Sequence, residues 1–380
     1  MTSDIQPSPP FSSKTSHGSA YGSNVHAVSA LEAMTRMGTQ TGAPGGFSAI
    51  IDARSEDEFS LDHLPGAINW PSLNNEQRIL IGTLYKQVGS FEAKKHGAAL
   101  VAANISQHIQ NNVLALPKDW QPLVYCWRGG KRSGSLALIL GQIGFKVSII
   151  EGGYKAFRSQ LIEAIPPLVE TLSWRVICGP TGAGKTRLLH CLKSQGAQVL
   201  DLEGLANHRS SVLGIMPGLP QPSQKHFDTL LWNELRQFDP SKPVYIESES
   251  RKVGNLAVPE ALILAMRASP CFKLELSDDE RVKLLLEDYD FFVTNPSFFR
   301  QRLDALVAIR GKQVVEEWQR LIMTGDIEKV VRDLLLTHYD PTYFASMQRN
   351  FLLIDQAKVI TAQDRSQKSM TLVAQSLAQA

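Results

Sequence analysis

A cysteine followed closely by two glycines and three cations is the first feature of this sequence that could do chemistry. The segment reads Cys126, Trp127, Arg128, Gly129, Gly130, Lys131, Arg132 and Ser133. In such a loop ahead of a helix, backbone N–H groups can surround one anion, and the positive potential favours thiolate over thiol. We therefore predict a nucleophilic Cys126 in an anion-binding loop. The alternative is a structural cysteine beside a solvated basic turn.

A second segment satisfies the phosphate-loop pattern G-x-x-x-x-G-K-[ST] in full. It comprises Gly179, Pro180, Thr181, Gly182, Ala183, Gly184, Lys185 and Thr186. The segment follows an apolar run and precedes a helical pattern, which is the context that the motif requires. Backbone N–H groups would surround a phosphate, Lys185 would neutralise it, and the Thr186 hydroxyl could hold Mg²⁺. The alternative is a glycine-rich turn with an incidental lysine.

Polar residues follow the next apolar runs and are expected at the same sheet edge as the phosphate loop. The candidates for supporting the phosphate site are Asp201 and Glu247, and those for binding RNA are His208, Arg209, Arg251 and Lys252. Asp201 could orient a metal, although an aspartate after a strand also commonly caps a helix. For the cations the alternative is ordinary surface charge.

The elements that must position these residues follow an α/β pattern. Short apolar strands are predicted at residues 47–52, 122–125, 146–150, 174–178, 198–201 and 243–246. Residues 133–144 carry an apolar helical face, and a strand–helix–strand order implies a parallel sheet. Beyond Pro259 the pattern turns helical, with a capping box at Ser277 and Glu280.

Four segments are predicted along the 380 residues. Residues 1–46 are rich in small residues and proline and are expected to be a flexible tail. A first α/β domain occupies residues 47–162, and residues 163–173, with Pro166 and Pro167, are expected to be a linker. A second α/β domain with C-terminal helices occupies residues 174–380.

The composition excludes several classes of protein. With 39 Lys plus Arg against 37 Asp plus Glu, no global basic excess indicates a nucleic-acid or membrane partner. The 4 cysteines lack close pairing and are too few for a disulfide scaffold, which points to a reducing compartment. No apolar run is long enough for a membrane span, and the N-terminus lacks the order of a signal peptide. A cytoplasmic protein without a membrane partner is expected.

The Cys126 loop lies in a wider pattern that resembles a rhodanese domain. The matching residues are residues 52–59, residues 63–69, residues 126–133 and Glu151-Gly152-Gly153-Tyr154. The resemblance implies that Cys126 carries sulfur or selenium. Arg132 departs from many sulfur-transferring rhodaneses because it stands six positions after Cys126, as in C-x5-R phosphatases, whereas Lys131 holds the nearer place. A cysteine-dependent phosphatase is therefore the rival interpretation of this half.

A rhodanese-like domain followed by a phosphate-loop domain resembles the tRNA 2-selenouridine synthase family, from about Phe47 onward. The resemblance implies a P-loop NTPase-like second domain and an enzyme of bacterial cytoplasm. The implied substrate is the wobble 2-thiouridine of the lysine, glutamate and glutamine tRNAs. The implied co-substrates are geranyl diphosphate, which alkylates the sulfur, and selenophosphate, which then supplies selenium. No tightly bound cofactor is expected, and Mg²⁺ is a candidate.

On that interpretation the two loops take separate roles. The Lys185 loop binds the diphosphate, while Cys126 attacks selenophosphate and carries selenium; Arg128, Lys131, Arg132 and the loop amides hold the phosphate group. The candidate walls of an apolar slot are Phe291, Phe292, Phe298 and Phe299, for which core packing is the alternative. Two other functions stay open: an ATP-dependent kinase or ATPase coupled to sulfur transfer, and a non-catalytic module that binds tRNA and senses anions.

Overall fold

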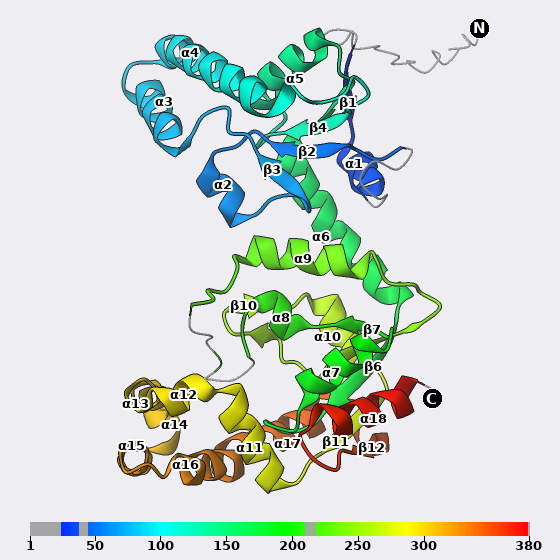
Figure 1. Cartoon of the computed structure of the whole chain (residues 1–380), viewed down its shortest axis with the longest axis vertical. Coiled ribbons are helices and arrows are strands. Elements are labelled where there is room, and N and C mark those ends of the chain that lie inside the picture. Colours follow the sequence, from blue (N-terminus) through cyan, green and yellow to red (C-terminus); the bar gives the residue numbers. More distant parts are fainter. Residues whose placement is uncertain (1–23, 38–44, 210–213, 215–217, 379–380) are drawn as a thin grey trace, which may run out of the picture. The chain divides into compact units, whose positions relative to one another are not determined.

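The computed structural model describes residues 24–37, 45–209, 214 and 218–378 of the chain (Figure 1). The chain divides into two compact units, one of Met1–Phe59 and Gly66–Phe157, the other of Ser60–Pro65 and Arg158–Ala380. Each unit is built around a five-stranded sheet, which confirms the α/β class. Among the described residues, no helix is both long and apolar enough to cross a membrane.

The first sheet has the strand order β1-β5-β4-β2-β3, and every neighbouring pair is parallel. Its strands are β1 (Val25–Val28), β2 (Ala49–Asp52), β3 (Ala67–Asn69), β4 (Pro122–Tyr125) and β5 (Val147–Ile150). The helices of this part are α1 (Ala30–Arg36), α2 (Glu56–Leu61), α3 (Asn75–Gln87), α4 (Ser90–His108), the π-helix η1 (Ile109–Val113) and α5 (Lys131–Ile143). Apolar side chains of β2, β4, β5, α4 and α5 form one core, as parallel strands covered by helices require.

Residues 25–36 correct the prediction of a flexible tail to residue 46. Val25–Val28 form the edge strand β1, which pairs in parallel with β5 from Val25 opposite Val147 to Val28 opposite Ile150. Helix α1 follows, capped by the side chain of Ser29. The strand was missed because four residues are too few to show a period within a segment rich in glycine and serine. Residues 1–23 and 38–44 of the predicted tail lie outside the described residues.

The predicted linker at residues 163–173 is also wrong. Helix α6 (Gly153–Thr171) runs through Pro166 and Pro167, and β6 begins at Ser173. Both prolines are exposed, so the carbonyl groups that lose an N–H partner face solvent. A buried stripe of Leu161, Ile165 and Val169 holds the other face of the helix.

The second sheet has the order β12-β11-β6-β8-β7, again with every neighbouring pair parallel. Its strands are β6 (Ser173–Cys178), β7 (Gln198–Leu200), β8 (Pro243–Glu247), β11 (Cys271–Glu275) and β12 (Lys358–Thr361). A separate antiparallel pair consists of β9 (Lys252–Val253) and β10 (Leu256–Ala257). The central strand β6 leads directly into the phosphate loop, where the carboxyl ends of β8 and β11 flank it.

The helices that accompany this sheet are α7 (Lys185–Ser194), α8 (Leu202–Ala206), α9 (Gln224–Leu235), α10 (Glu260–Arg267) and α18 (Gln367–Ala378). Helix α7 carries the end of the phosphate loop, and α18 packs against it. Leu188 and Leu192 of α7 share a core with Met370 and Ala374 of α18. The second sheet and its covering helices therefore hold the phosphate loop on a rigid base.

Several of the remaining helices form a second core of the same unit. The remaining helices are α11 (Asp278–Asp288), α12 (Asp290–Thr294), α13 (Pro296–Leu303), η2 (Asp304–Leu306), α14 (Val307–Arg310), α15 (Lys312–Met323), α16 (Ile327–Leu334), η3 (Leu335–Tyr339), α17 (Asp340–Asn350) and η4 (Ile354–Gln356). Ser277 caps α11 by accepting a hydrogen bond from the Glu280 N–H at 3.4 Å, which is one half of the predicted capping box. The Glu280 carboxylate does not complete the box, because it pairs with Arg365 and Lys283. Phe299 and Trp318 are buried in the centre of this helical core.

Candidate functional site

The first candidate site is the loop that joins β4 to α5 and begins at Cys126. The side chain of Cys126 is buried, and the Ser133 hydroxyl donates a hydrogen bond to its sulfur at 3.1 Å. The backbone carbonyl of Cys126 accepts a hydrogen bond from the Tyr154 N–H at 2.8 Å. The carbonyl of Trp127 accepts one from the Lys155 N–H at 3.0 Å. These bonds fix the loop against the start of α6, with its sulfur before the positive end of α5.

Two glycines let the loop pack this closely. Gly153 has a φ of 60°, and a Cβ there would lie 2.3 Å from the Cys126 carbonyl oxygen and 2.4 Å from the Gly129 nitrogen. Gly129 has a φ of 65°, and a Cβ there would lie 2.7 Å from the Ile150 carbonyl oxygen. Only glycine fits both positions. The Glu151-Gly152-Gly153-Tyr154 stretch thus forms the base of the cysteine loop.

The cations of this loop differ in their surroundings. Arg128 and Lys131 are exposed at the rim with Gly130, whereas the guanidinium of Arg132 pairs with the carboxylate of Glu58 at 2.6 and 3.3 Å. Burial acts to raise the pKa of Glu58, but the hydrogen bonds and charge of Arg132 hold it below its ordinary value. Sequence reasoning assigned Glu58 no role, because the partner lies 74 positions away from Arg132.

A buried ion pair supports the loop from β2. Arg54 is 2% exposed and Asp52 is fully buried, with 2.6 Å between the guanidinium and the carboxylate. The guanidinium also lies over the ring of Tyr154, at 4.0 Å from its centroid. Removing one partner of such a pair would leave a buried charge. This pair thereby links β2 to the residue that bonds the Cys126 carbonyl.

The second candidate site is the phosphate loop between β6 and α7. Gly182 and Gly184 have φ values of 76° and 88°, which turn the chain so that α7 begins at Lys185. The Lys185 ammonium donates to the Gly179 carbonyl at 2.9 Å, and the Gly179 N–H donates to the Tyr343 hydroxyl at 2.6 Å. The loop is therefore held from α17 by a tyrosine that the motif does not include.

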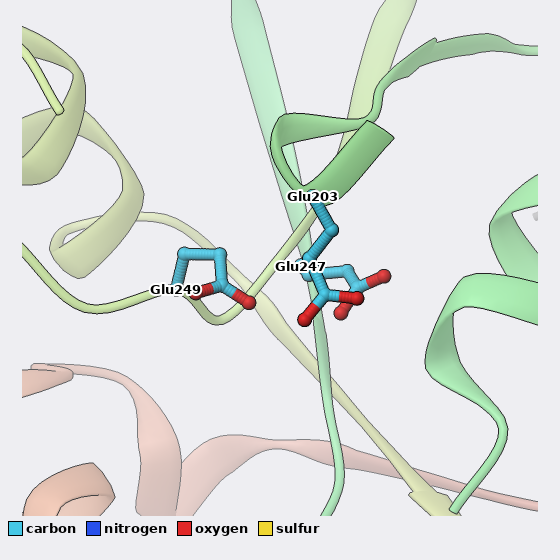
Figure 2. A group of neighbouring side chains, drawn as sticks. All are labelled: Glu203, Glu247 and Glu249. Carbon is cyan, nitrogen blue, oxygen red and sulfur yellow. The ribbon is translucent and has the colours of Figure 1, made fainter. Parts of the chain in front are cut away.

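The carboxylate oxygens of three glutamates lie close together, as Figure 2 shows. Ligand atoms of Glu203, Glu247 and Glu249 lie within 4.8 Å of one another, and the Thr186 hydroxyl donates to Glu247 at 2.8 Å. Burial and the charge of Glu203 raise the pKa of Glu247 well above its ordinary value. A hydroxyl and three carboxylates are the hard oxygen donors that Mg²⁺ prefers. The donor set thus fits a divalent cation next to the phosphate loop.

Asp201 takes the alternative role that its position allowed. Its carboxylate caps α8 by accepting the Gly204 N–H at 2.8 Å, and it lies 3.2 Å from Nε2 of His190. The carboxylate that meets Thr186 from this segment is that of Glu203, at 3.3 Å. The carboxylate that reaches Thr186 therefore lies on the short helix α8, two residues after Asp201. The strand pattern alone does not indicate this position.

A buried arginine from α11 holds the phosphate loop on its other side. Two nitrogens of Arg281 donate to the Thr181 carbonyl at 2.8 and 3.1 Å. The same guanidinium pairs with Asp340 at 2.6 and 3.0 Å and with Asp278 at 2.9 Å. Arg281 is 4% exposed. Its only sequence signal was its place just after the capping box, which gives no indication of these partners.

The phosphate loop opens onto a cleft of about 830 Å³ and an adjoining apolar cavity of about 50 Å³. The cleft is lined by Lys185, Thr186 and the three glutamates. Apolar side chains dominate the cavity, which is lined among others by Leu285, Phe292, Phe299, Val331, Leu334 and Leu335. Both spaces share four lining residues: Thr181, Leu285, Tyr289 and Tyr339. Of the predicted aromatic walls, Phe291 and Phe298 instead pack on the helical core.

The four candidate RNA contacts occupy different environments. His208 is buried, and desolvation lowers its pKa. Arg209 donates to the Asp288 carbonyl at 2.7 Å and lies over Tyr289 in the cleft. Arg251 and Lys252 are exposed at the start of the β9–β10 hairpin. The structure thus brings Arg209 to the phosphate loop and leaves Arg251 and Lys252 on the surface.

The three cysteines outside the first loop, Cys178, Cys191 and Cys271, are buried. Hydrogen bonding to Cys271 and burial raise the pKa of the Cys178 thiol. The Cys191 sulfur accepts a hydrogen bond from Gln367 at 3.1 Å. All three have the surroundings of structural cysteines.

Family comparisons cover both units. Residues 30–160 match the rhodanese-like domain, and residues 172–378 match the tRNA 2-selenouridine synthase AAA domain. The first match begins in α1, in agreement with the corrected boundary of the first unit.

Three curated proteins named tRNA 2-selenouridine synthase are similar to this chain. The protein of Marinobacter nauticus is 31% identical over 354 residues, which span 84% of this chain and 95% of its own length. That of Nitrosomonas europaea is 40% identical over 67% of this chain, and that of Nitrosomonas eutropha is 38% identical over 63%. The aligned regions span 66% and 62% of these two Nitrosomonas proteins.

Proposed function

Since the chain belongs to the family of tRNA 2-selenouridine synthases, we propose that it replaces the sulfur of wobble 2-thiouridine in tRNA with selenium. The acceptors are the lysine, glutamate and glutamine tRNAs, and the selenium donor is selenophosphate. The work is divided between the two loops. Geranyl diphosphate bound at the phosphate loop alkylates the sulfur, and the Cys126 loop supplies selenium.

The observation that carries the alkylation step is the apolar cavity beside the phosphate loop. A ligand with a diphosphate at Lys185 and a hydrocarbon chain between Phe292 and Leu334 would use both spaces. A nucleotide would need polar partners for its base and ribose, whereas the cavity walls are dominated by hydrocarbon. An isoprenoid diphosphate therefore suits this site better than ATP does.

The residues of the phosphate loop act on the leaving group. The thiocarbonyl sulfur attacks C1 of geranyl diphosphate, the C–S bond forms, and the C–O bond breaks with its electron pair leaving on the diphosphate. The base loses its N3 proton to solvent. Lys185 and the N–H groups of residues 182–186 stabilise that charge. Lys185 first gives up its hydrogen bond to the Gly179 carbonyl, so the loop exchanges an internal partner for the ligand.

The glutamate cluster is the place for a divalent cation in this scheme. Thr186, Glu203, Glu247 and Glu249 would hold Mg²⁺, which would neutralise part of the diphosphate charge when bound. The same cation would relieve the repulsion between the three carboxylates.

Selenation uses the Cys126 loop. The N–H groups of the loop and Arg128 bind the phosphate group of selenophosphate, and the sulfur of Cys126 attacks selenium. The S–Se bond forms while the Se–P bond breaks, and phosphorus takes the electron pair and leaves as phosphite. The selenium bound to Cys126 then attacks C2 of the base, and the C–S bond breaks with its electron pair leaving on geranylthiolate. A thiol reductant cleaves the remaining S–Se bond, which releases 2-selenouridine and restores Cys126. Alkylation has already turned the sulfur into a thiolate leaving group, which makes this replacement feasible.

The test is mass spectrometry of nucleosides from thiolated tRNA incubated with protein, geranyl diphosphate and selenophosphate. Wild type should give 2-selenouridine, Cys126→Ala should stop at S-geranyl-2-thiouridine, and Lys185→Ala should give neither. If wild type leaves 2-thiouridine unchanged while it hydrolyses ATP, the proposal fails and the nucleotide-driven alternative replaces it. Binding of tRNA without any turnover would instead indicate the non-catalytic module.

A further inference from the structure

His338 is a histidine of the phosphate-loop cleft that the two loops do not use. It belongs to η3, the π-helix between α16 and α17, and it is 8% exposed. The residue lines the cleft, and its ring packs edge-on against Tyr339, with 4.9 Å between the ring centroids. In the part of the chain that the structure describes, no hydrogen bond or ion pair engages its imidazole, and neither ring nitrogen is fully enclosed. π-Helical turns are frequent at functional sites.

One face of η3 and α17 forms a wall of the cleft. Lining residues recur along it with helical spacing, among them His338, Thr342, Tyr343, Ser346 and Asn350. Tyr343 meets the phosphate loop, since its hydroxyl accepts the Gly179 N–H and its ring centroid lies 5.8 Å from the Lys185 ammonium. His338 stands five residues earlier on the same wall, which is about 7 Å along a helix axis. A ligand that extends from Lys185 along this wall therefore reaches His338.

The carboxylates and the second histidine of the cleft are engaged. Asp288 accepts a hydrogen bond from Arg187 at 2.5 Å, and Nε2 of His190 lies 3.2 Å from Asp201. The three glutamates form the candidate cation site. Among the described residues of the cleft, the imidazole of His338 is thus the proton acceptor that a ligand can use.

The surroundings of His338 keep its ring uncharged near neutral pH. Burial and the charge of Arg310, from α14, lower the pKa of His338. Helices α16 and α17 pack on η3. Their charged side chains are either exposed, as for Glu328, Lys329 and Arg349, or paired elsewhere: Arg332 with Asp279 at 2.9 Å, Asp333 with the Trp318 indole at 2.6 Å, and Asp340 with Arg281 at 2.6 Å. An uncharged imidazole has one ring nitrogen that can accept a proton.

We propose that His338 is the general base that removes the N3 proton of 2-thiouridine when its sulfur is alkylated. The inference rests on the proposed function, in which the nucleobase meets geranyl diphosphate in this cleft. C1 of that ligand is bonded to the diphosphate, so the attacking sulfur must lie beside the phosphate loop. N3 is separated from the sulfur only by C2, which brings the N3 proton to the same wall.

Proton removal makes the sulfur a better nucleophile. The N3–H bond breaks and leaves its electron pair on the nucleobase, while the proton passes to a ring nitrogen of His338. The negative charge spreads over N3, C2 and the sulfur, which then attacks C1 as the diphosphate departs. His338 afterwards releases the proton to solvent, so the imidazole is restored for the next turnover.

The test follows formation of S-geranyl-2-thiouridine by the full-length protein on an anticodon stem–loop with wobble 2-thiouridine. His338→Ala should lower kcat about 100-fold, whereas the KM for RNA and the affinity for inorganic pyrophosphate should stay unchanged. Wild-type kcat should fall at acidic pH as the imidazole is protonated. His338→Ala should lack this acidic limb, and its rate should rise with pH as N3 ionises in solvent. Added imidazole should restore part of its rate, and His338→Gln should be as slow as His338→Ala.

Three comparisons separate a catalytic role from a structural one. RNA that already carries S-geranyl-2-thiouridine has no N3 proton, so His338→Ala should convert it to 2-selenouridine at the wild-type rate. His96→Ala removes an exposed histidine of α4 and should change neither step. Arg310→Gln removes the charge that acts on His338 and should move the acidic limb to higher pH. This last variant carries the test if the His338 variants do not fold.

The outcomes distinguish this inference from the proposed function. Wild-type kcat in His338→Ala, an acidic limb that persists there at the same pH, or an unmoved limb in Arg310→Gln would overturn the inference and leave the proposed function intact. An equal loss of selenation on the alkylated RNA would also overturn it, by assigning His338 a structural role. If wild type forms no S-geranyl-2-thiouridine, the proposed function fails and the inference falls with it.

Discussion

Replacing Arg281 with methionine should destabilise the second unit and displace the phosphate loop. The substitution leaves the Asp340 carboxylate, 8% exposed, without the guanidinium that pairs with it at 2.6 Å. Breaking a buried pair from one side costs about 3–5 kcal/mol. For a unit of this size that corresponds to a fall in melting temperature on the order of 10 °C.

A second substitution separates stability from loop position. Arg281→Met combined with Asp340→Leu removes both charges, so the free energy of unfolding should return to within about 1–2 kcal/mol of wild type. The Thr181 carbonyl still lacks both donors in the double variant, so pyrophosphate binding should stay weak. Stability recovers in this comparison, and ligand affinity does not.

The assays are urea denaturation and calorimetric titration with pyrophosphate. Arg320→Met, which breaks an exposed pair with Glu317, is the matched control and should change stability by less than about 1 kcal/mol. The reasoning is refuted if Arg281→Met behaves like this control. The reasoning is equally refuted if the double variant loses as much free energy of unfolding as the single variants Arg281→Met and Asp340→Leu lose together.

Three further predictions concern the two loops and the cavity. Because the pKa of Glu58 is lowered, its ionised form contributes stability that is lost as the pH falls through that pKa; Glu58→Gln should remove this acid dependence in thermal melts from pH 3 to 7. Glu247→Gln should weaken Mn²⁺ binding about tenfold or more by titration, whereas exposed Glu170→Gln should not. Val331→Phe should fill the apolar cavity and weaken geranyl diphosphate relative to inorganic pyrophosphate in calorimetry; equal losses would contradict that pocket.

Much of the fold follows from local patterns in the sequence. The predicted strand at residues 122–125 is β4, and that at residues 243–246 is β8 with one added residue. Both are short apolar runs that parallel sheets bury on two faces, which makes the signal strong. The C-terminal part of helix α6 was not predicted, because its two prolines are typical of a linker. These prolines lie on the exposed face, and the buried stripe on the other face determines the conformation.

The residues of the candidate site also fall into two groups, those with a local signal in the sequence and those without one. The glycines, Lys185 and Thr186 of the phosphate loop act through their own backbone, so their spacing alone identifies them. Glu58, Arg281 and Tyr343 reach the loops from remote segments, and their roles arise only when the chain folds. Tyr343, for example, bonds a residue 164 positions earlier in the chain. No local period or motif records such a contact.

The packing of α18 on α7 has a consequence for how the chain acquires its structure. Thr371 contacts the sulfur of Cys191, which lies 180 positions earlier in the chain, and a Cβ at Gly184 would lie 2.6 Å from the Met370 side chain. Until that distant segment arrives, Leu188 and Leu192 have an uncovered apolar face. Such a closure has a high contact order and therefore forms slowly. During synthesis the second unit thus passes through a stage in which its ligand loop is already translated but has no partner helix, and this stage is the one most exposed to aggregation.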